Sequence, residues 1–410
     1  MKNLQRRVTA LAAALSLAAP TAQAFEAIDT IGWPSRGLFP AYPADETRPT
    51  GVMLEAGVMR DDNVLRTEND AQADTVTRVG GAFRHEQRIV GRQRLRLDAR
   101  GDYYKYDHFS NLDHGAYALG GGWLWEIGNN LAGTLTAGYV HRQADPGETQ
   151  ADRLDLVKSA TLAGTAVYLI TPRLRLRGGL SGLKEERTQA VATESRATTG
   201  TAAIEYVSPL LNTLGLEYRS TQGEAPQAVG VTGNPDYVEN ELAVVATYAL
   251  GAQLRFTGRL GYTSRDYDEE TATQHNFAGT TGRMLLEWLP GYKTILGLSV
   301  YREPRSVVDV AASHMIVSGV SFGPRWAVTN KAVLGAQLVS ERRRFDGDPS
   351  IAGGVTLRDE LLHLVRISFG WEPARFWQVS AALDHGERDS NIVGRDYKFN
   401  AVMGNIAYSW

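Results

Sequence analysis

The feature that most constrains this chain is the alternation of charged and apolar residues in one segment after another. In the stretch 93–104, QRLRLDARGDYY, every even-numbered residue from 94 to 102 is charged, and the odd-numbered residues between them are apolar or glycine. The stretches 173–180, RLRLRGGL, and 253–265, QLRFTGRLGYTSR, repeat the pattern. A period of two separates the two kinds of residue onto opposite faces of an extended chain. These segments therefore predict β-strands with one charged and one apolar face.

Short turns are predicted to join these strands into hairpins. Aromatic residues precede most of the turns at a spacing near 40 residues, which fits two strands of about ten residues, a tight turn and a longer polar connector. The first strand is predicted near Val52–Arg60. The turns are predicted near Val90-Gly91, Gly128–Asn130, Thr171–Arg173, Pro209–Asn212, Gly251-Ala252, Pro290–Lys293, Thr329–Lys331 and Pro373–Arg375. The aromatics are Trp125, Tyr168, Tyr206, Tyr248, Trp288, Trp326 and Trp371, and Trp410 ends the series.

A repeat of this length also occurs in propellers and solenoids, but a propeller blade has four short strands, whereas each unit here has two with unequal faces. The sequence shows no candidate helices to cover so many apolar faces, so those faces are expected to meet lipid. A spanning sheet must close on itself, because hydrocarbon offers no hydrogen-bond partners. The sequence thus predicts an all-β fold, a transmembrane antiparallel up-and-down β-barrel of about 18 strands, with 16 to 20 acceptable. Short periplasmic turns and moderate extracellular loops would connect them.

The N-terminus indicates the compartment. Residues 1–24 combine a basic start, a short apolar run and the small-residue site Ala22-Gln23-Ala24, which together predict a cleaved signal peptide. The segment 25–50 contains four prolines and is predicted to be irregular and periplasmic. The barrel is predicted to occupy 51–410, in the outer membrane of a Gram-negative bacterium.

The C-terminal stretch NAVMGNIAYSW is predicted to be the last strand, with Tyr408 and Trp410 on its apolar face. Aromatic rings gather at membrane interfaces, where a ring lies among acyl chains and its polar edge meets headgroups. Tyr408 and Trp410 are therefore expected to belong to an interfacial girdle in contact with outer-membrane lipid. The terminal aromatic also resembles the signal by which the barrel-assembly machinery recognises its substrates, although Gly404 stands one place from the usual glycine position.

Several functions find no support in the sequence. Cysteine is absent, which excludes disulfides and thiolate chemistry, and the net charge of −3 gives no reason to expect nucleic acid. The eight histidines lack the spacing of a metal site, so neither metal nor cofactor is predicted. The pattern GVSFG at 319–323 requires a strand-to-helix turn to form a nucleophile elbow, yet it alternates like a strand. LGGGWLWEIG precedes no helix that could bind phosphate. The chain is not expected to be an enzyme.

The charged faces are predicted to line the lumen. Arginines on adjacent strands would attract anions or acidic sugars, because a guanidinium is always charged and pairs with carboxylates. Alternatively, they pair with neighbouring acids and only keep the lumen wet. The polar connectors are moderate in length and mostly acidic, and none is expected to be long enough to fold inward as a large constriction loop. The predicted pore-lining residues are Arg84, Arg94, Arg96, Asp98, Arg100, Arg175, Arg177, Arg255, Arg259, Glu287 and Arg366.

The first strand with GVMRDDNVLR, the arginine-rich strands and the terminal aromatic strand resemble the β-barrel porins encoded in exopolysaccharide gene clusters, the EpsL-like outer-membrane proteins. The local motif is Asp-Asn-Val-x-Arg, at Asp62–Arg66. The resemblance implies a conduit through which a secreted polysaccharide, the cargo, leaves the cell, aligned by a periplasmic export partner. Two alternatives stay open: a passive diffusion porin for small anionic or sugar solutes, and a barrel-borne hydrolase or adhesion scaffold.

Overall fold

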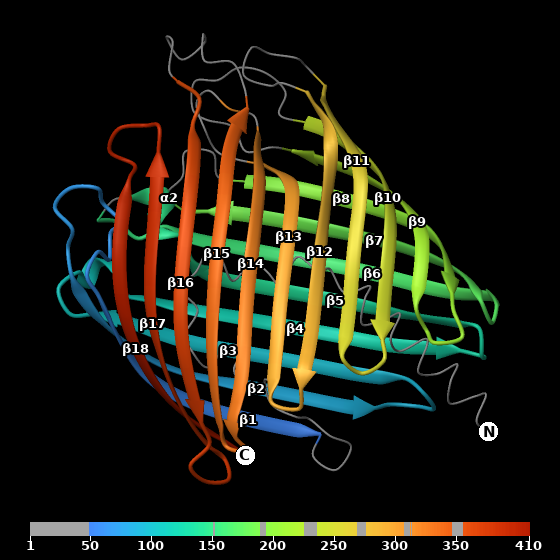
Figure 1. Cartoon of the computed structure of the whole chain (residues 1–410), viewed down its shortest axis with the longest axis horizontal. Coiled ribbons are helices and arrows are strands. Elements are labelled where there is room, and N and C mark those ends of the chain that lie inside the picture. The colour runs from blue at the N-terminus through green and yellow to red at the C-terminus, as the bar shows by residue number, and fades with distance from the viewer. Residues whose placement is uncertain are drawn as a thin grey trace.

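The computed structural model describes residues 49–150, 152–188, 194–224, 236–268, 276–306, 312, 314–346 and 356–410. The predicted signal peptide and the predicted N-terminal segment as far as residue 48 lie outside the described residues. Within them the chain forms one antiparallel sheet of eighteen strands that closes on itself (Figure 1). This confirms the predicted fold class and the predicted strand number.

The strands follow one another around the barrel in chain order, each paired with its neighbours in sequence. A 3-10 helix, η3 (Ser110–Leu112), and a single helical turn, α2 (Pro146–Thr149), lie in connectors. Among the described residues, no helix has the length and apolar character needed to cross a membrane. The strands are β1 (Thr50–Asp61), β2 (Asp74–Arg88), β3 (Arg94–Tyr106), β4 (His114–Ile127), β5 (Leu131–Gln143), β6 (Leu156–Thr171), β7 (Leu174–Arg187), β8 (Glu194–Val207), β9 (Thr213–Glu224), β10 (Asp236–Leu250), β11 (Leu254–Tyr267), β12 (Phe277–Gly291), β13 (Thr294–Ser306), β14 (His314–Thr329), β15 (Ala332–Asp346), β16 (Asp359–Trp371), β17 (Trp377–Ser390) and β18 (Tyr397–Ser409).

The first and last strands close the barrel. β1 and β18 pair in register from Met53 opposite Ser409 to Asp61 opposite Ala401. Beyond that ladder, Val52 and Trp410 exchange two backbone hydrogen bonds of 3.1 and 3.0 Å. Because every strand has a partner on both sides, the sheet presents no open edge to lipid.

All eight predicted turns join consecutive strands at one end of the barrel, and the longer connectors lie at the other end. Gly91 and Gly251 have φ near +60° in their turns. Tight hairpins require positive φ, which glycine adopts without a Cβ clash. The turn chemistry therefore fixes which strands become neighbours.

The two faces of the sheet differ as the alternation predicts. Leu97, Leu176 and Leu260 are 44 to 50% exposed on the outward face, whereas the charged residues between them point inward. Among the described residues, no strand carries an inward lysine. Lys105, Lys158, Lys184 and Lys398 alternate with the inward residues of their strands, and Lys293 and Lys331 lie in turns. Apart from histidine, the inward cations of the strands are all arginines.

Outward aromatic rings gather at both ends of the barrel. At the turn end, Tyr408 lies 4.9 Å from Trp377 and 5.6 Å from Trp410, measured between ring centroids. A second ring of exposed tyrosines lies toward the connector end, which the sequence reasoning missed because these residues precede no turn. Its members are Tyr103, Tyr117, Tyr218 and Tyr262, with Tyr139 beside Tyr117.

Gly133 lies under the ring of Trp125, one of the aromatics that precede the turns. A Cβ on Gly133 would lie 2.2 Å from Cζ2 of Trp125, so only glycine lets the indole lie flat against the neighbouring strand. Gly133 and Trp125 are directly opposite in the β4–β5 ladder.

Removal of the terminal ring tests the role predicted for Trp410. Trp410→Ala is expected to lower the yield of folded barrel in outer-membrane fractions several-fold, because slower assembly exposes the chain to proteolysis. The measurement is the fraction that resists heat-induced unfolding on a detergent gel. Trp123→Ala, which removes another exposed tryptophan, is the control. Equal yields of the two variants would contradict the role of Trp410 as an insertion signal.

Candidate functional site

The register places all eleven predicted pore-lining residues on the inward face. Arg84 lies directly opposite Asp98, Arg255 opposite Glu287, and Arg366 opposite Asp384. Each of the eleven takes part in an ion pair. The interpretation that these arginines pair with neighbouring acids is therefore right as a description of their contacts.

The pairs differ in how far water reaches them. The side chains of Arg94 and Arg96 are each 43% exposed and that of Arg255 is 69% exposed, whereas that of Arg175 is 5% exposed. Exposed ion pairs contribute about 0–1 kcal/mol to the free energy of unfolding, so their partners exchange readily. Removing one partner of a buried pair costs about 3–5 kcal/mol. The exposed arginines can therefore meet a solute, while the buried ones hold the wall together.

A buried cluster joins the first three strands to the last. Arg78, fully buried, pairs with Glu55 and donates to Oδ1 of Asn405 at 2.9 Å. Arg100 also pairs with Glu55, and its Nε lies 2.8 Å from Oδ2 of Asp102. The sequence reasoning missed Arg78 and Glu55, although the same inward parity on β1 and β2 could have identified them. This cluster links strands on both sides of the β1–β18 closure.

A second inward cluster lies on β7 to β11. Nη2 of Arg177 lies 2.7 Å from Glu205 and 2.8 Å from Glu217. Glu217 also faces two further arginines of the cluster, and Glu205 also pairs with Arg175. Four arginines thus share three glutamates, which leaves one formal positive charge in excess within the cluster. Its members are Arg175, Arg177, Arg219, Arg259, Glu205, Glu217 and Glu241.

Two donors in this cluster are not satisfied. The Nε atoms of Arg219 and Arg259 are buried and have no hydrogen-bond acceptor among the described residues. Nε of Arg259 lies 3.3 Å from Oε1 of Glu217, but that oxygen also lacks a hydrogen bond. A buried N–H without an acceptor is costly, so these two donors could bind an additional acceptor.

The connector between β5 and β6 corrects one prediction. It was not expected to be long enough for a large constriction loop, yet its helical turn α2 docks against strands near the opposite side of the mouth (Figure 1). Asp145 caps the turn by accepting from the backbone N–H of Gly147 at 2.9 Å, and Pro146 occupies the first helical position. A connector of about twelve residues is at most about 40 Å long. Because it leaves β5 and returns to the neighbouring strand β6, its tip can reach about 20 Å from this wall.

Glu148 holds this connector in place. Its carboxylate lies 2.8 Å from Nη1 of Arg343 and 3.3 Å from Nη2 of Arg358, and the neighbouring carbonyl of Gly147 accepts from Nη1 of Arg388 at 2.7 Å. Burial alone would raise the pKa of Glu148, but the surrounding arginines lower that pKa to about 2. We call the contact of Glu148 with Arg343 and Arg358 the latch.

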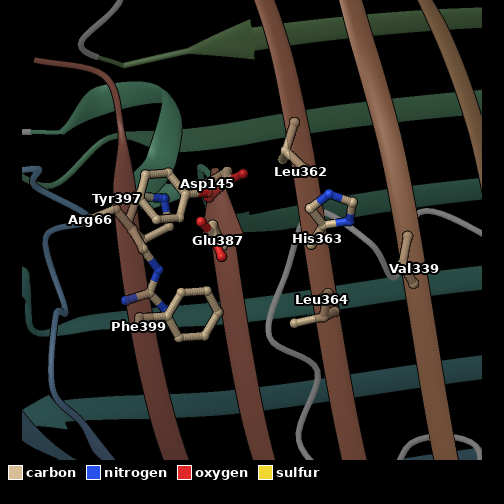
Figure 2. A pocket seen from close by; sticks show the side chains of 10 residues that line it. Arg66, Asp145, Val339, Leu362, His363, Leu364, Glu387, Tyr397 and Phe399 are labelled. Atoms are coloured by element: carbon tan, nitrogen blue, oxygen red, sulfur yellow. The ribbon is translucent and has the colours of Figure 1, made fainter. Parts of the chain in front are cut away.

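A small cavity lies beside the latch (Figure 2). The guanidinium of Arg66 lies 3.6 Å from the centroid of the Phe399 ring, and its Nη2 lies 2.7 Å from Oδ2 of Asp61. Since Arg66 is already paired and stacked, the cavity is a packing feature of the mouth rather than a ligand site. It is lined by Arg66, Asp145, Pro146, Val339, Leu362, His363, Leu364, Glu387, Tyr397 and Phe399.

The structure also tests whether the chain contains a nucleophile elbow or a group that could bind a metal ion. Ser321 lies within β14, directly opposite Val339, so GVSFG forms no strand-to-helix elbow. Among the described residues, one group has a geometry that could hold a metal ion: Asp74, Asp107 and His108. The carboxylate of Asp74 already accepts backbone N–H groups of His108 and Phe109, which is the usual role of a capping aspartate.

The latch gives a prediction with a definite sign. Glu148→Gln is expected to raise the undocked population of the connector about tenfold, the factor for about 1.4 kcal/mol. The measurement is the frequency of high-conductance events in planar bilayers.

The pH dependence of the latch follows from the pKa of Glu148, which is lowered to about 2 from 4.5. The stabilisation of the docked connector by Glu148 is therefore complete above pH 4.5 and is lost as the pH falls toward 2. Acidification from pH 7 to pH 5 should therefore leave the wild-type channel unchanged.

Asp70→Asn is the matched control, because Asp70 is an exposed acid in the connector after β1 with no ion pair among the described residues. An unchanged event frequency in Glu148→Gln, or an equal rise in the control, would contradict the latch.

No protein-family model and no curated protein matches this sequence. Among solved structures, OccK2 (OpdF) of Pseudomonas aeruginosa is similar with a TM-score of 0.50 and 13% identity, over 88% of this chain and 97% of that one. OpdK of Pseudomonas aeruginosa, solved with vanillate, has a TM-score of 0.48 and 11% identity, over 88% and 99% of the two chains. OccAB3 of Acinetobacter baumannii has a TM-score of 0.48 and 11% identity, over 88% and 98%. The likeness to OccK2 is one of fold: both chains form a closed antiparallel β-barrel of the kind found in outer-membrane porins. The resemblance to exopolysaccharide-cluster barrels stays a prediction.

Proposed function

We propose that this chain is a passive diffusion channel for small anionic solutes, including acidic sugars. The observation that carries the proposal is the cluster on β7 to β11, where four arginines share three glutamates. Its unsatisfied Nε donors belong to arginines whose side chains are 35% and 21% exposed, Arg219 and Arg259. A solute carboxylate can supply the missing acceptors without breaking a fully buried pair.

Arginine suits this role better than lysine. Its planar guanidinium presents five N–H groups, so it can keep one acid partner while it binds a passing carboxylate. Exposed pairs are weak, at about 0–1 kcal/mol, so the solute can replace the acid and leave again. Arg94, Arg96 and Arg255 are the predicted pore-lining residues with the exposure for such exchange. We therefore retain them as proposed contacts of the solute path.

The docked connector favours a channel for small solutes over the export of a polymer. A conduit for a long polymer requires a mouth without a folded constriction, whereas Glu148 ties the β5–β6 connector to Arg343 and Arg358 on the far side of the mouth. A polymer that is threaded continuously would have to keep this latch open throughout. A small solute can pass beside it.

Charge removal tests the anion path. Arg219→Gln is expected to lower the permeability ratio of chloride to potassium about twofold, since one charge about 8 Å away contributes about 0.5 kcal/mol in water. The ratio follows from the reversal potential across a bilayer under a salt gradient. Arg302→Gln is the control, because Arg302 alternates with the inward residues of β13 and lies outside. If both variants keep the wild-type potential, the β7–β11 cluster does not border the path.

Solute size separates the two transport hypotheses. Proteoliposomes are expected to swell rapidly in a monomeric hexuronate and slowly in the oligomer of the same sugar, because the docked connector narrows the mouth. Rates are followed by light scattering, with liposomes without protein as the blank. Equal swelling rates for monomer and oligomer would favour the export conduit.

A further inference from the structure

The outward face of β4 to β6 carries a group of polar side chains that the solute path does not use. Tyr117 is directly opposite His141, and His141 is directly opposite Lys158, so the three lie in one row across neighbouring strands. The Tyr117 ring stacks on that of Tyr139 at 5.8 Å and lies 4.9 Å from the His141 ring, measured between centroids. We call Tyr117, Tyr139, His141 and Lys158 the outer polar row.

The position of the outer polar row along the strands places it at the membrane–water interface on the connector side. Leu119, Leu135 and Leu162 lie on the same strands nearer the turns, are 44 to 57% exposed, and face the acyl chains. The outer polar row lies next to these leucines on the connector side, at the level of the second ring of exposed tyrosines. Because the connectors are extracellular in barrels of this kind, the row lies at the headgroup level of the outer leaflet.

The row also has unused binding capacity. Lys158 has no ion-pair partner among the described residues, although Glu186 is directly opposite it on β7. Glu186 is instead paired with Lys184 at 2.6 Å, and Glu194 pairs with Lys184 and Arg196. Nδ1 of His141 is buried and lacks a hydrogen-bond partner. Glu186 and Glu194 are therefore engaged by Lys184 and Arg196, whereas Lys158 and Nδ1 of His141 have no such partner among the described residues.

Two other outward cations are instead paired with acids on the barrel. Arg342 is paired with Asp359 at 2.6 Å, and Lys398 with Glu387 at 2.7 Å. Their charges are balanced on the barrel itself. An ammonium group, an imidazole and two phenolic hydroxyls together offer the charge and the donors that a phosphate monoester needs, since it carries between one and two negative charges and three acceptor oxygens.

We propose that the outer polar row binds the phosphorylated headgroup of an outer-leaflet lipid, with the chemistry of lipid A. Lys158 supplies the charge, His141 and the tyrosine hydroxyls supply hydrogen bonds, and the leucines below pack against the acyl chains. The site anchors the barrel laterally in the outer leaflet and is independent of the lumen.

Lipid binding to the purified barrel tests this site. Bisphosphorylated lipid A, added to delipidated protein in detergent, is expected to raise the Tm of the wild type, whereas dephosphorylated lipid A and inorganic phosphate are not. The double variant Lys158→Gln/His141→Gln is expected to bind lipid A about tenfold more weakly, the factor for one lost charge-assisted hydrogen bond. Its bilayer conductance should equal that of the wild type, which shows that the barrel is folded.

Lys398→Gln serves as the control because it removes an outward lysine that is already paired. The proposal fails if the double variant keeps the wild-type affinity, or if the dephosphorylated lipid gives the same rise in Tm. A rise in Tm with inorganic phosphate alone would identify a free-anion site instead of a lipid site.

Discussion

The rest of this structure depends on the hydrogen-bonding requirement of backbone groups in hydrocarbon. A strand edge that faces lipid leaves N–H and C=O groups without partners, at several kcal/mol for each group. The ladder between β1 and β18 removes that edge, and the bonds between Val52 and Trp410 complete it at the end of the chain. Closure in turn fixes which face of every strand is outside. Once this is settled, the alternation of the sequence assigns apolar residues to lipid and charges to the interior.

The interior must then accommodate many charges in a confined space. Arginine does so because one guanidinium can bridge two carboxylates, as Arg177 bridges Glu205 and Glu217. The buried pair of Arg78 with Glu55 joins β1 to β2, and Arg78 also donates to Asn405 of β18 across the closure. A lone buried charge at this place would be strongly destabilising. Pairs nearer water hold their partners weakly. The same residue type thus stabilises the wall in one place and presents donors to solutes in another, and exposure decides which.

Much of the fold could be predicted from the sequence, because strand period and turn chemistry are local properties. The eight turns and the inward parity of Arg84, Arg255 and Arg366 follow from them directly. The latch could not be predicted in this way. Glu148 and Arg343 are 195 residues apart, and their contact depends on where β5 and β15 stand around the closed barrel. The short sequence DPGET indicates a capped turn, but not the wall on which that turn docks. The unsatisfied donors of Arg219 and Arg259 likewise depend on how three-dimensional neighbours share Glu217.

The central claim is that apolar faces meet lipid and charged faces enclose water. Because the chain contains no cysteine, single cysteines for nitroxide labels can be introduced one at a time along β11, from Leu254 to Tyr267, without removing a native thiol. In reconstituted protein, collision rates with oxygen, which concentrates in lipid, and with a water-soluble nickel chelate report the surroundings of each label. The account predicts opposite oscillations with a period of two: labels at Leu260 and Tyr262 collide mainly with oxygen, and labels at Arg259 and Thr263 mainly with the chelate. Collision rates that do not alternate along β11, or that alternate in the reverse phase, would contradict it.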